Sequence, residues 1–350
     1  MIQPKRNDGT HRANLLPGDG IPGLVSVIVP IYNRETLIDG MLESVKSQTY
    51  RPIEIIAVDD GSTDRSAAVV REWAASNEDQ NLVVRILKQE NSGAPAARNR
   101  GLSQADGEFI QFFDSDDRML TAKLQTQVSA LRDWPAAGFA YSNVRAASVV
   151  DIPRLLKDPA ARQESVIGYQ PVAGSSIPGL VARGVFRRST VRSVGYWSEA
   201  LRRYQDWEYS VRYVASGQLA LACDELGFFT GLHDNPRIKD ANDEVSNTFG
   251  LVRHAAESAL NTLSHCDPEI RTAKIKIAQL YSFALVVALR RNDVGEAKSF
   301  VNKIRELTPP NHTVRMKNEA YYQLASRFGA ANVDAIAKRV LRWKKRRSGA

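Results

Sequence analysis

The stretch VSVIVPI, residues 25–31, is a continuous apolar run rich in β-branched residues, which is typical of a strand buried on both faces. Apolar residues at helical spacing follow over 36–47, and a second apolar run, IEIIAVDD, begins at residue 53. The alternation continues with expected helices over 64–75, 95–103 and 121–134 and expected strands over 83–87, 109–114 and 139–143. Strands that alternate with helices predict an α/β fold with a parallel, doubly wound sheet.

Length and composition indicate an ordinary globular protein of more than one part. The chain has 350 residues, of which 43% are hydrophobic and 25% are charged, so a mainly disordered, collagenous or coiled-coil protein is excluded. This length suggests about two domains. The first 23 residues are polar and rich in glycine and proline, and from about residue 244 onward the pattern is almost entirely helical.

Two cysteines, Cys223 and Cys266, form no C-x-x-C pair, so we expect neither a disulfide framework nor a cysteine zinc site. That usage suits a reducing compartment. The longest apolar stretch, residues 280–289, is too short to span a membrane, and the N-terminus lacks the apolar core of a signal peptide. We therefore expect a cytoplasmic protein, or a peripheral one on the cytoplasmic face of the membrane.

The net charge of +8 is concentrated at the C-terminus, where residues 335–350 carry seven basic side chains and no acidic ones. The body is therefore nearly neutral, and a general nucleic-acid surface is not expected. Apolar residues at helical spacing make the tail a basic amphipathic helix suited to an anionic membrane surface. The alternatives are a terminal helix packed on the body and a contact with nucleic acid.

Acidic side chains follow two of the expected strands. Asp59 and Asp60 end the second strand, and Asp114, Asp116 and Asp117 (DSDD) end the fourth. The carboxyl ends of parallel strands meet at one edge of a sheet, where five carboxylates repel one another unless a cation lies among them. A divalent cation on a diphosphate fits this chemistry. The alternative is that the aspartates serve as turn and cap residues.

Four segments resemble, in order and spacing, the nucleotide-sugar domain of glycosyltransferase family 2. They read VSVIVPIYNRETLIDGMLESVKSQTY (25–50), IEIIAVDDGSTD (53–64), NSGAPAARNRGL (91–102) and GEFIQFFDSDDRM (107–119). The resemblance is strong over 24–145, weaker over 176–217, and absent from the C-terminal third. It implies a GT-A fold, a Rossmann-like, mostly parallel sheet flanked by helices.

Composition, residue pattern and the resemblance together divide the chain. The expected parts are an N-terminal arm (1–23), the nucleotide-sugar-binding half (24–145), the acceptor-side half with the catalytic base (146–240), a helical C-terminal region (241–332) and the basic amphipathic tail (333–350).

The family's donor site carries over to Pro30, Tyr32, Arg34, Asp60, Asn91, Gly93, Arg98, Asp114, Ser115 and Asp116. The resemblance implies that the Tyr32 ring stacks on a base, that Asp60 accepts a hydrogen bond from uracil, and that the loop with Arg98 closes on the donor. Asp59 is expected to fix the turn.

The DSDD segment matches the family's D-x-D motif, so the resemblance implies that Asp114 and Asp116 hold the ribose and a Mn²⁺ or Mg²⁺ ion. Asp117 is a further candidate ligand. His233, in FFTGLHDNP, is another, although a lone histidine is also commonly structural or exposed.

The expected catalytic base is Asp206 in YQDWEYSVR. The family usually has Glu-Asp here, and this chain has Gln205-Asp206, so the aspartate is kept. Glu208 is the second candidate, and a helix-start role for Asp206 is the structural alternative. A single base opposite the leaving group implies inversion at the anomeric carbon. Trp197 and Trp207 line an acceptor groove in one interpretation and belong to the core in the other.

These features predict a metal-dependent inverting glycosyltransferase that moves a sugar from a UDP-sugar to a glycan or lipid-linked glycan acceptor, in bacterial surface polysaccharide assembly. The segment RVLRW, residues 339–343, lacks the glutamine of the processive Q-x-x-R-W box, so we expect non-processive transfer. One alternative is a sugar nucleotidyltransferase, although PIYNRET replaces the glycine-rich basic loop of that class. Another is an inactive sugar-nucleotide-binding or membrane-scaffold protein.

Overall fold

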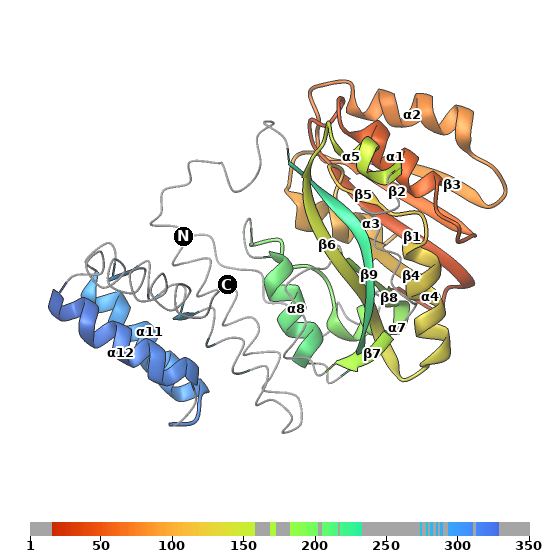
Figure 1. The fold of residues 1–350 in the computed structure, drawn as a ribbon. Coiled ribbons are helices and arrows are strands. Elements are labelled where there is room, and N and C mark those ends of the chain that lie inside the picture. The colour runs from red at the N-terminus through yellow and green to blue at the C-terminus, as the bar shows by residue number, and fades with distance from the viewer. Residues whose placement is uncertain are drawn as a thin grey trace. The chain divides into compact units, whose positions relative to one another are not determined.

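A computed structural model describes two compact units, residues 1–241 and 242–350. In the first unit it describes residues 16–157, 169–172, 183–201, 205–215 and 218–232; in the second it describes 293–310, 313–328 and seven single positions between 274 and 289 (Figure 1).

The first unit is built on one nine-stranded sheet with the order β3-β2-β1-β4-β8-β6-β9-β5, and β7 pairs with β9. The strands are β1 (Ile21–Ile31), β2 (Ile53–Asp59), β3 (Leu82–Lys88), β4 (Gly107–Phe112), β5 (Arg118–Met119), β6 (Ala137–Ser148), β7 (Tyr169–Val172), β8 (Gly184–Arg187) and β9 (Leu219–Leu232). Strands β3, β2, β1 and β4 are parallel, which confirms the expectation for the N-terminal half.

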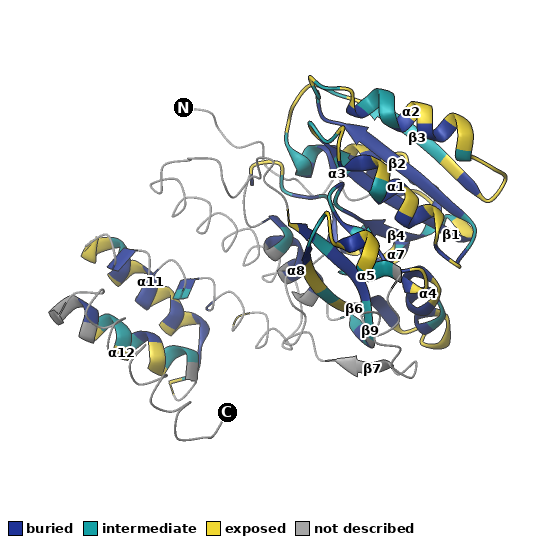
Figure 2. Cartoon of the chain, turned by 45° about the horizontal axis from the view of Figure 1, so that its top comes forward, coloured by how far each residue is buried: buried dark blue, intermediate teal, exposed yellow. Residues whose placement is uncertain are grey.

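Helices cover both faces of this sheet (Figure 2). The helices α1 (Ile38–Lys46), α2 (Ser66–Asn77) and α4 (Lys123–Asp133) share a buried cluster with Val25, Val27 and Val29 of β1. The helices α3 (Ala94–Leu102), α7 (Arg188–Val194) and α8 (Gln205–Ala215) share another with Ile28 of β1. Since successive residues of a strand point to opposite faces, the two clusters lie on opposite sides, and the doubly wound α/β class is confirmed.

The sheet departs from a fully parallel one beyond β4. The segment GVFR forms β8, which lies antiparallel between β4 and β6. Its Val185 belongs to one buried cluster and its Phe186 to the other, so both faces of the short strand are covered. The expected fifth strand is β6, longer than predicted, and it pairs in parallel with β9. A short helix, α5 (Ile152–Lys157), packs beside β6 and β9 in a small satellite cluster.

The chain joins the body before β1. Leu16 is 2% exposed and packs in the same cluster as Ile28. Arg188 donates to the carbonyl oxygens of Pro17, Ala105 and Gly107, and Arg192 donates to the carbonyl of Leu16. Residues 16–20 of the expected N-terminal arm are therefore held against α7 by its arginines.

The second unit contains α11 (Val294–Leu307) and α12 (Thr313–Phe328). Asp293 caps α11 by accepting a hydrogen bond from the Glu296 amide at 3.0 Å, and Glu319 of α12 pairs with Arg305 of α11 at 2.9 Å. None of the described helices is long and apolar enough to cross a membrane. The expected membrane-binding tail lies outside the described residues.

Candidate active site

The two acidic segments lie at one edge of the sheet, as the sequence predicts. Strand β1 lies between β2 and β4 and is parallel to both. The residues that follow β2 and β4 therefore emerge at the same edge, where ligands bind in sheets of this kind. Asp59 ends β2 and Asp60 follows it, and Asp114, Asp116 and Asp117 come from the turn after β4.

Asp60 holds the loop between β3 and α3. Its Oδ1 accepts hydrogen bonds from Gln89 Nε2 and the Ser92 amide, each at 2.8 Å, and its Oδ2 accepts one from the Gly93 amide at 2.8 Å. Gly93 has a φ of +90°, a conformation that glycine adopts without steric cost. The family resemblance implies that Asp60 binds the uracil ring of the sugar donor. The structure adds that Asp60 fixes this loop, which includes Asn91.

Asp59 is a turn residue, as expected, since its carboxylate accepts a hydrogen bond from the Ser62 amide at 2.9 Å. The loop after β1 is attached to the same turn. The Asn33 amide donates to Ser62 Oγ at 3.0 Å, and the Arg34 amide donates to Ser66 Oγ at 2.7 Å. These bonds fix the backbone that follows Tyr32, and Tyr32 itself is 45% exposed.

The three aspartates of the DSDD turn differ in exposure. The Asp114 side chain is 39% exposed and Asp116 is partly exposed, whereas Asp117 is 3% exposed. Burial, with the nearby Asp114 and Asp116, raises the pKa of Asp117 well above its ordinary value, and its carboxylate accepts a hydrogen bond from the Gly231 amide of β9 at 3.2 Å. Ser115 is buried between these two partly exposed acids.

The donor set of this turn fits a hard divalent cation. Carboxylate oxygens are ligands that Mg²⁺ and Mn²⁺ prefer, and such ions commonly take their remaining ligands from water and substrate phosphates. The exposed pair Asp114 and Asp116 supplies that kind of oxygen. Within the described part of the chain, no three His, Cys, Asp or Glu side chains gather into a complete protein site. His233 lies outside the described residues.

Arg98 joins the DSDD turn to the candidate base. The guanidinium is buried, and its Nη2 lies 2.8 Å from Asp114 Oδ1, while its Nη1 lies 3.0 Å from Gln205 Oε1 and 3.8 Å from Asp206 Oδ1. The guanidinium also lies over the ring of Trp197, 4.5 Å from its centroid. One cation therefore bridges carboxylates that lie 92 positions apart in the chain.

Asp206 is in the first turn of α8, and its side chain is 41% exposed. The surrounding protein removes enough water to raise the pKa of Asp206 to about 6, with Arg98 lowering it and Asp114 raising it further. A carboxylate with that pKa is both ionised at neutral pH and a stronger base than an ordinary aspartate. Gln205 keeps the contact with Arg98 without adding a third carboxylate.

Glu208, the second candidate base, is excluded by its surroundings. It is fully buried and forms two hydrogen bonds with Arg212, at 2.7 and 2.8 Å. An acceptor hydroxyl therefore has no access to this carboxylate, which instead fixes α8.

Trp197 belongs to the core beneath the site. Its ring stacks on Tyr209 with a centroid separation of 4.3 Å and meets Phe112 edge to face at 5.2 Å. This supports the core interpretation of Trp197 over the acceptor-groove one. The side chain of Trp207 lies outside the described residues.

Comparison with known proteins identifies this region. The family model "Glycosyl transferase family 2" matches residues 26–174. A Campylobacter jejuni protein named GalNAc(5)-diNAcBac-PP-undecaprenol beta-1,3-glucosyltransferase is 35% identical over 102 residues, which cover 29% of this chain and 32% of that protein. The chain spans even less, 13% to 28%, of three further glycosyltransferases that are 40% to 46% identical to it.

Two solved structures share the fold. The structure of S. aureus TarS 1–349 in complex with UDP-GlcNAc has a TM-score of 0.60 at 19% identity and covers 87% of this chain and 90% of that one. The mannosyltransferase PcManGT from Pyrobaculum calidifontis, in complex with GDP-Man and Mn²⁺, has a TM-score of 0.53 at 19% identity and covers 90% and 86%.

Proposed function

Because residues 26–174 form a glycosyltransferase family 2 domain, we propose that the chain is a metal-dependent, inverting glycosyltransferase with a UDP-sugar donor. One observation carries the proposal: the buried Arg98 holds Asp114 of the DSDD turn at 2.8 Å and the Asp206 carboxylate at 3.8 Å. A donor-binding acid and a base therefore face one small volume at the ligand-binding edge of the sheet.

The donor would lie between the loop after β1 and the loop after β3. The exposed Tyr32 ring offers a face on which a base can stack. Asp60 fixes the Ser92 and Gly93 amides and retains acceptor capacity for an N–H of uracil. The TarS complex with UDP-GlcNAc supports a uridine nucleotide.

Asp114 and Asp116 would hold a Mn²⁺ or Mg²⁺ ion on the diphosphate. The ion, when bound, supplies positive charge that stabilises the departing diphosphate. The PcManGT complex with Mn²⁺ supports a divalent metal, as does the carboxylate chemistry of the turn.

Asp206 would act as the general base. The acceptor hydroxyl oxygen forms a bond to the anomeric carbon while the bond from that carbon to the diphosphate oxygen breaks. The hydroxyl proton passes to Asp206, and UDP leaves with the bonding electron pair. Attack from the side opposite the leaving group inverts the anomeric configuration.

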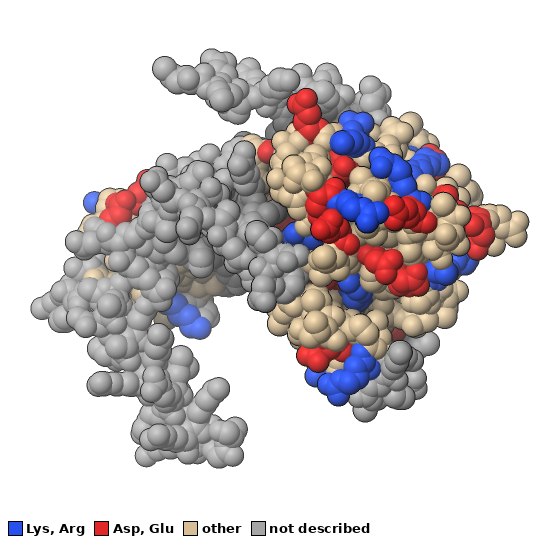
Figure 3. Space-filling model, turned by 90° about the horizontal axis from the view of Figure 1, so that it is seen from above, with Lys and Arg blue, Asp and Glu red and all other residues tan. Residues whose placement is uncertain are grey.

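The acceptor is proposed to be a glycan or lipid-linked glycan of bacterial surface polysaccharide assembly, extended by one sugar per encounter. The undecaprenol-linked substrate in the name of the Campylobacter relative supports a lipid-linked acceptor. The basic tail, residues 333–350, would bring the enzyme to an anionic membrane from the cytoplasmic side. On the face of the first unit in Figure 3, acidic and basic side chains are interspersed.

Donor binding provides the direct test of the proposed function. UDP with Mn²⁺ should raise the melting temperature of the chain, because a ligand that binds only the folded state stabilises it. Asp116→Ala should weaken Mn²⁺-assisted UDP binding in calorimetry by at least about tenfold, through loss of a cation ligand. Asp133→Ala, an exposed acid at the end of α4, is the control and should bind like the wild type. Equal affinity in Asp116→Ala would contradict the metal site.

The pH dependence of transfer follows from the pKa of Asp206. The base must be ionised to accept a proton, and the pKa of Asp206 is about 6. The rate should therefore rise between about pH 5 and pH 7, with a midpoint near the pKa. Initial rates of UDP release from UDP-GlcNAc in the presence of acceptor, across this range, measure the profile. A rate that is independent of pH between these limits would contradict a carboxylate base.

A further inference from the structure

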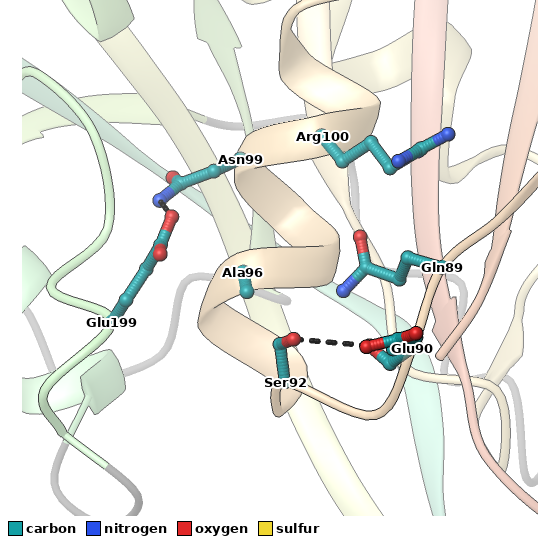
Figure 4. A pocket seen from close by; sticks show the side chains of 7 residues that line it. All are labelled: Gln89, Glu90, Ser92, Ala96, Asn99, Arg100 and Glu199. Carbon is teal, nitrogen blue, oxygen red and sulfur yellow. Dashed lines mark hydrogen bonds between the residues drawn. The ribbon is translucent and has the colours of Figure 1, made fainter. Parts of the chain in front are cut away.

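A hydrophilic groove of about 410 Å³ lies across α3, beside the loop that Asp60 fixes. Figure 4 shows Ala96 on the helix, with Asn99 and Glu199 on one side of the groove and Gln89, Glu90 and Arg100 on the other. Because Ala96 carries only a methyl group, it leaves space between the two walls.

The walls are fixed from two directions. On one side, Asn99 Nδ2 donates to the Trp197 carbonyl at 3.0 Å and to Glu199 Oε1 at 2.8 Å, and its Oδ1 accepts from the Trp197 amide at 2.8 Å. On the other side, Gln89 is held by its bond to Asp60. A ligand that enters the groove thus meets side chains that are already ordered, which reduces the entropic cost of binding.

The chemistry of the lining selects the class of ligand. Two carboxylates and one guanidinium give the groove a net charge of −1, which disfavours a phosphate or another anion. Ala96 is its only apolar side chain, so a lipid tail has no surface to cover. Carboxylates accept hydrogen bonds and a guanidinium donates them, so the lining suits a neutral ligand whose groups do both, as hydroxyl groups do. A neutral polyhydroxyl molecule satisfies this lining.

Contacts of α3 and of residues 197–199 connect the groove to the reaction centre. Arg98 contacts Asp206 at 3.8 Å, and the following residue of α3, Asn99, contacts Glu199. Glu199 in turn precedes the base by seven residues. Arg98 also lies over the ring of Trp197, and Asn99 binds its main chain, so Trp197 joins the groove wall to the arginine beside the base.

We propose that this groove binds a sugar unit of the acceptor glycan other than the unit that is glycosylated. The inference rests on the proposed function and adds a second point of acceptor recognition, which favours an oligosaccharide chain over a single sugar. Its occupant is a neutral sugar unit recognised through vicinal hydroxyl groups.

The test measures disaccharide binding to the full chain loaded with UDP and Mn²⁺. Chitobiose, cellobiose, maltose and lactose serve as probes in saturation-transfer NMR. At least one should bind the wild type. Ala96→Phe should weaken that binding by about tenfold, because the ring fills the space between the walls. Arg100→Ala, at an exposed position, should weaken it about threefold through loss of a donor.

Ala68→Phe, at a similarly half-exposed alanine of α2 on the other face of the sheet, is the matched control and should bind like the wild type. The stabilisation by UDP and Mn²⁺ should be unchanged in Ala96→Phe. If UDP stabilises the wild type but no probe binds, or if Ala96→Phe binds as well as the wild type, the groove assignment is overturned and the proposed function stands. If UDP fails to stabilise the wild type, the proposed function itself fails.

Discussion

Asp206→Asn should reduce glycosyl transfer by roughly a thousandfold, within the range that removal of a general base produces. The amide has nearly the shape of the carboxylate but does not accept a proton. The affinity for UDP with Mn²⁺ should stay within about twofold, since the substitution removes no donor contact. Steady-state transfer from UDP-GlcNAc, together with calorimetry of UDP binding, separates the two quantities.

Glu208→Gln is an informative comparison for Asp206→Asn. It removes a charge two residues away that is fully buried against Arg212, so its effect should be a loss of stability and not of the chemical step. Its melting temperature should fall, while transfer per folded molecule should stay near that of the wild type. Wild-type turnover in Asp206→Asn would reject Asp206 as the base.

Arg98→Met should lower transfer at pH 7 by about a hundredfold, because the guanidinium acts on both carboxylates of the reaction centre. Arg98 lowers the pKa of Asp206, so its removal raises that pKa and moves the rising limb of the pH profile to higher pH. A thioether also packs well against the ring of Trp197, so the core beneath should remain filled. The measurements are the pH profile of transfer and the melting temperature.

Arg98→Lys is the matched control, since it keeps the positive charge but loses the planar fork that reaches Asp114 and Gln205 together. The rate of transfer by Arg98→Lys should rise over the same pH range as that of the wild type, even if the rate itself is lower. A rising limb in Arg98→Met that coincides with that of the wild type would show that Arg98 does not set the pKa of the base.

Local sequence patterns predicted the parts of this fold that depend on neighbouring residues. Apolar runs identified β1, β2 and β4, with β-branched residues in the first two and phenylalanines in the third, because a strand covered on both faces buries most of its side chains. The rule that parallel strands end at one edge then brought Asp60 and the DSDD turn together. Resemblance to a family supplied Asp206, which composition and spacing alone would have left as an ordinary helix-start acid.

Contacts between distant segments were not predictable in the same way. Arg98 and Gln205 lie 107 positions apart, and no periodicity in either segment indicates that the two side chains meet. Gln89 and Ser92, which hydrogen-bond to Asp60, were missed for a related reason. They lie in a loop, and loop residues follow no repeating pattern. The asparagine-serine-glycine sequence after β3 was the available signal. Glu208 had an acidic side chain at a suitable position, and only its burial against Arg212 excluded it.

The hydrogen bonds from α7 to the residues before β1 have an evolutionary consequence. Arg188 and Arg192 bind main-chain carbonyls of Leu16 and Pro17, and every amino acid carries such a group. Most side chains of residues 16–20 can therefore change in evolution without loss of these hydrogen bonds. Three positions are constrained nonetheless: Leu16 has a buried side chain, Gly18 has a φ of +66°, and Gly20 has a φ of +79° and a Cβ there would lie 2.6 Å from the Gly107 oxygen. A comparison of side chains alone would therefore understate how firmly residues 16–20 are attached to the sheet domain.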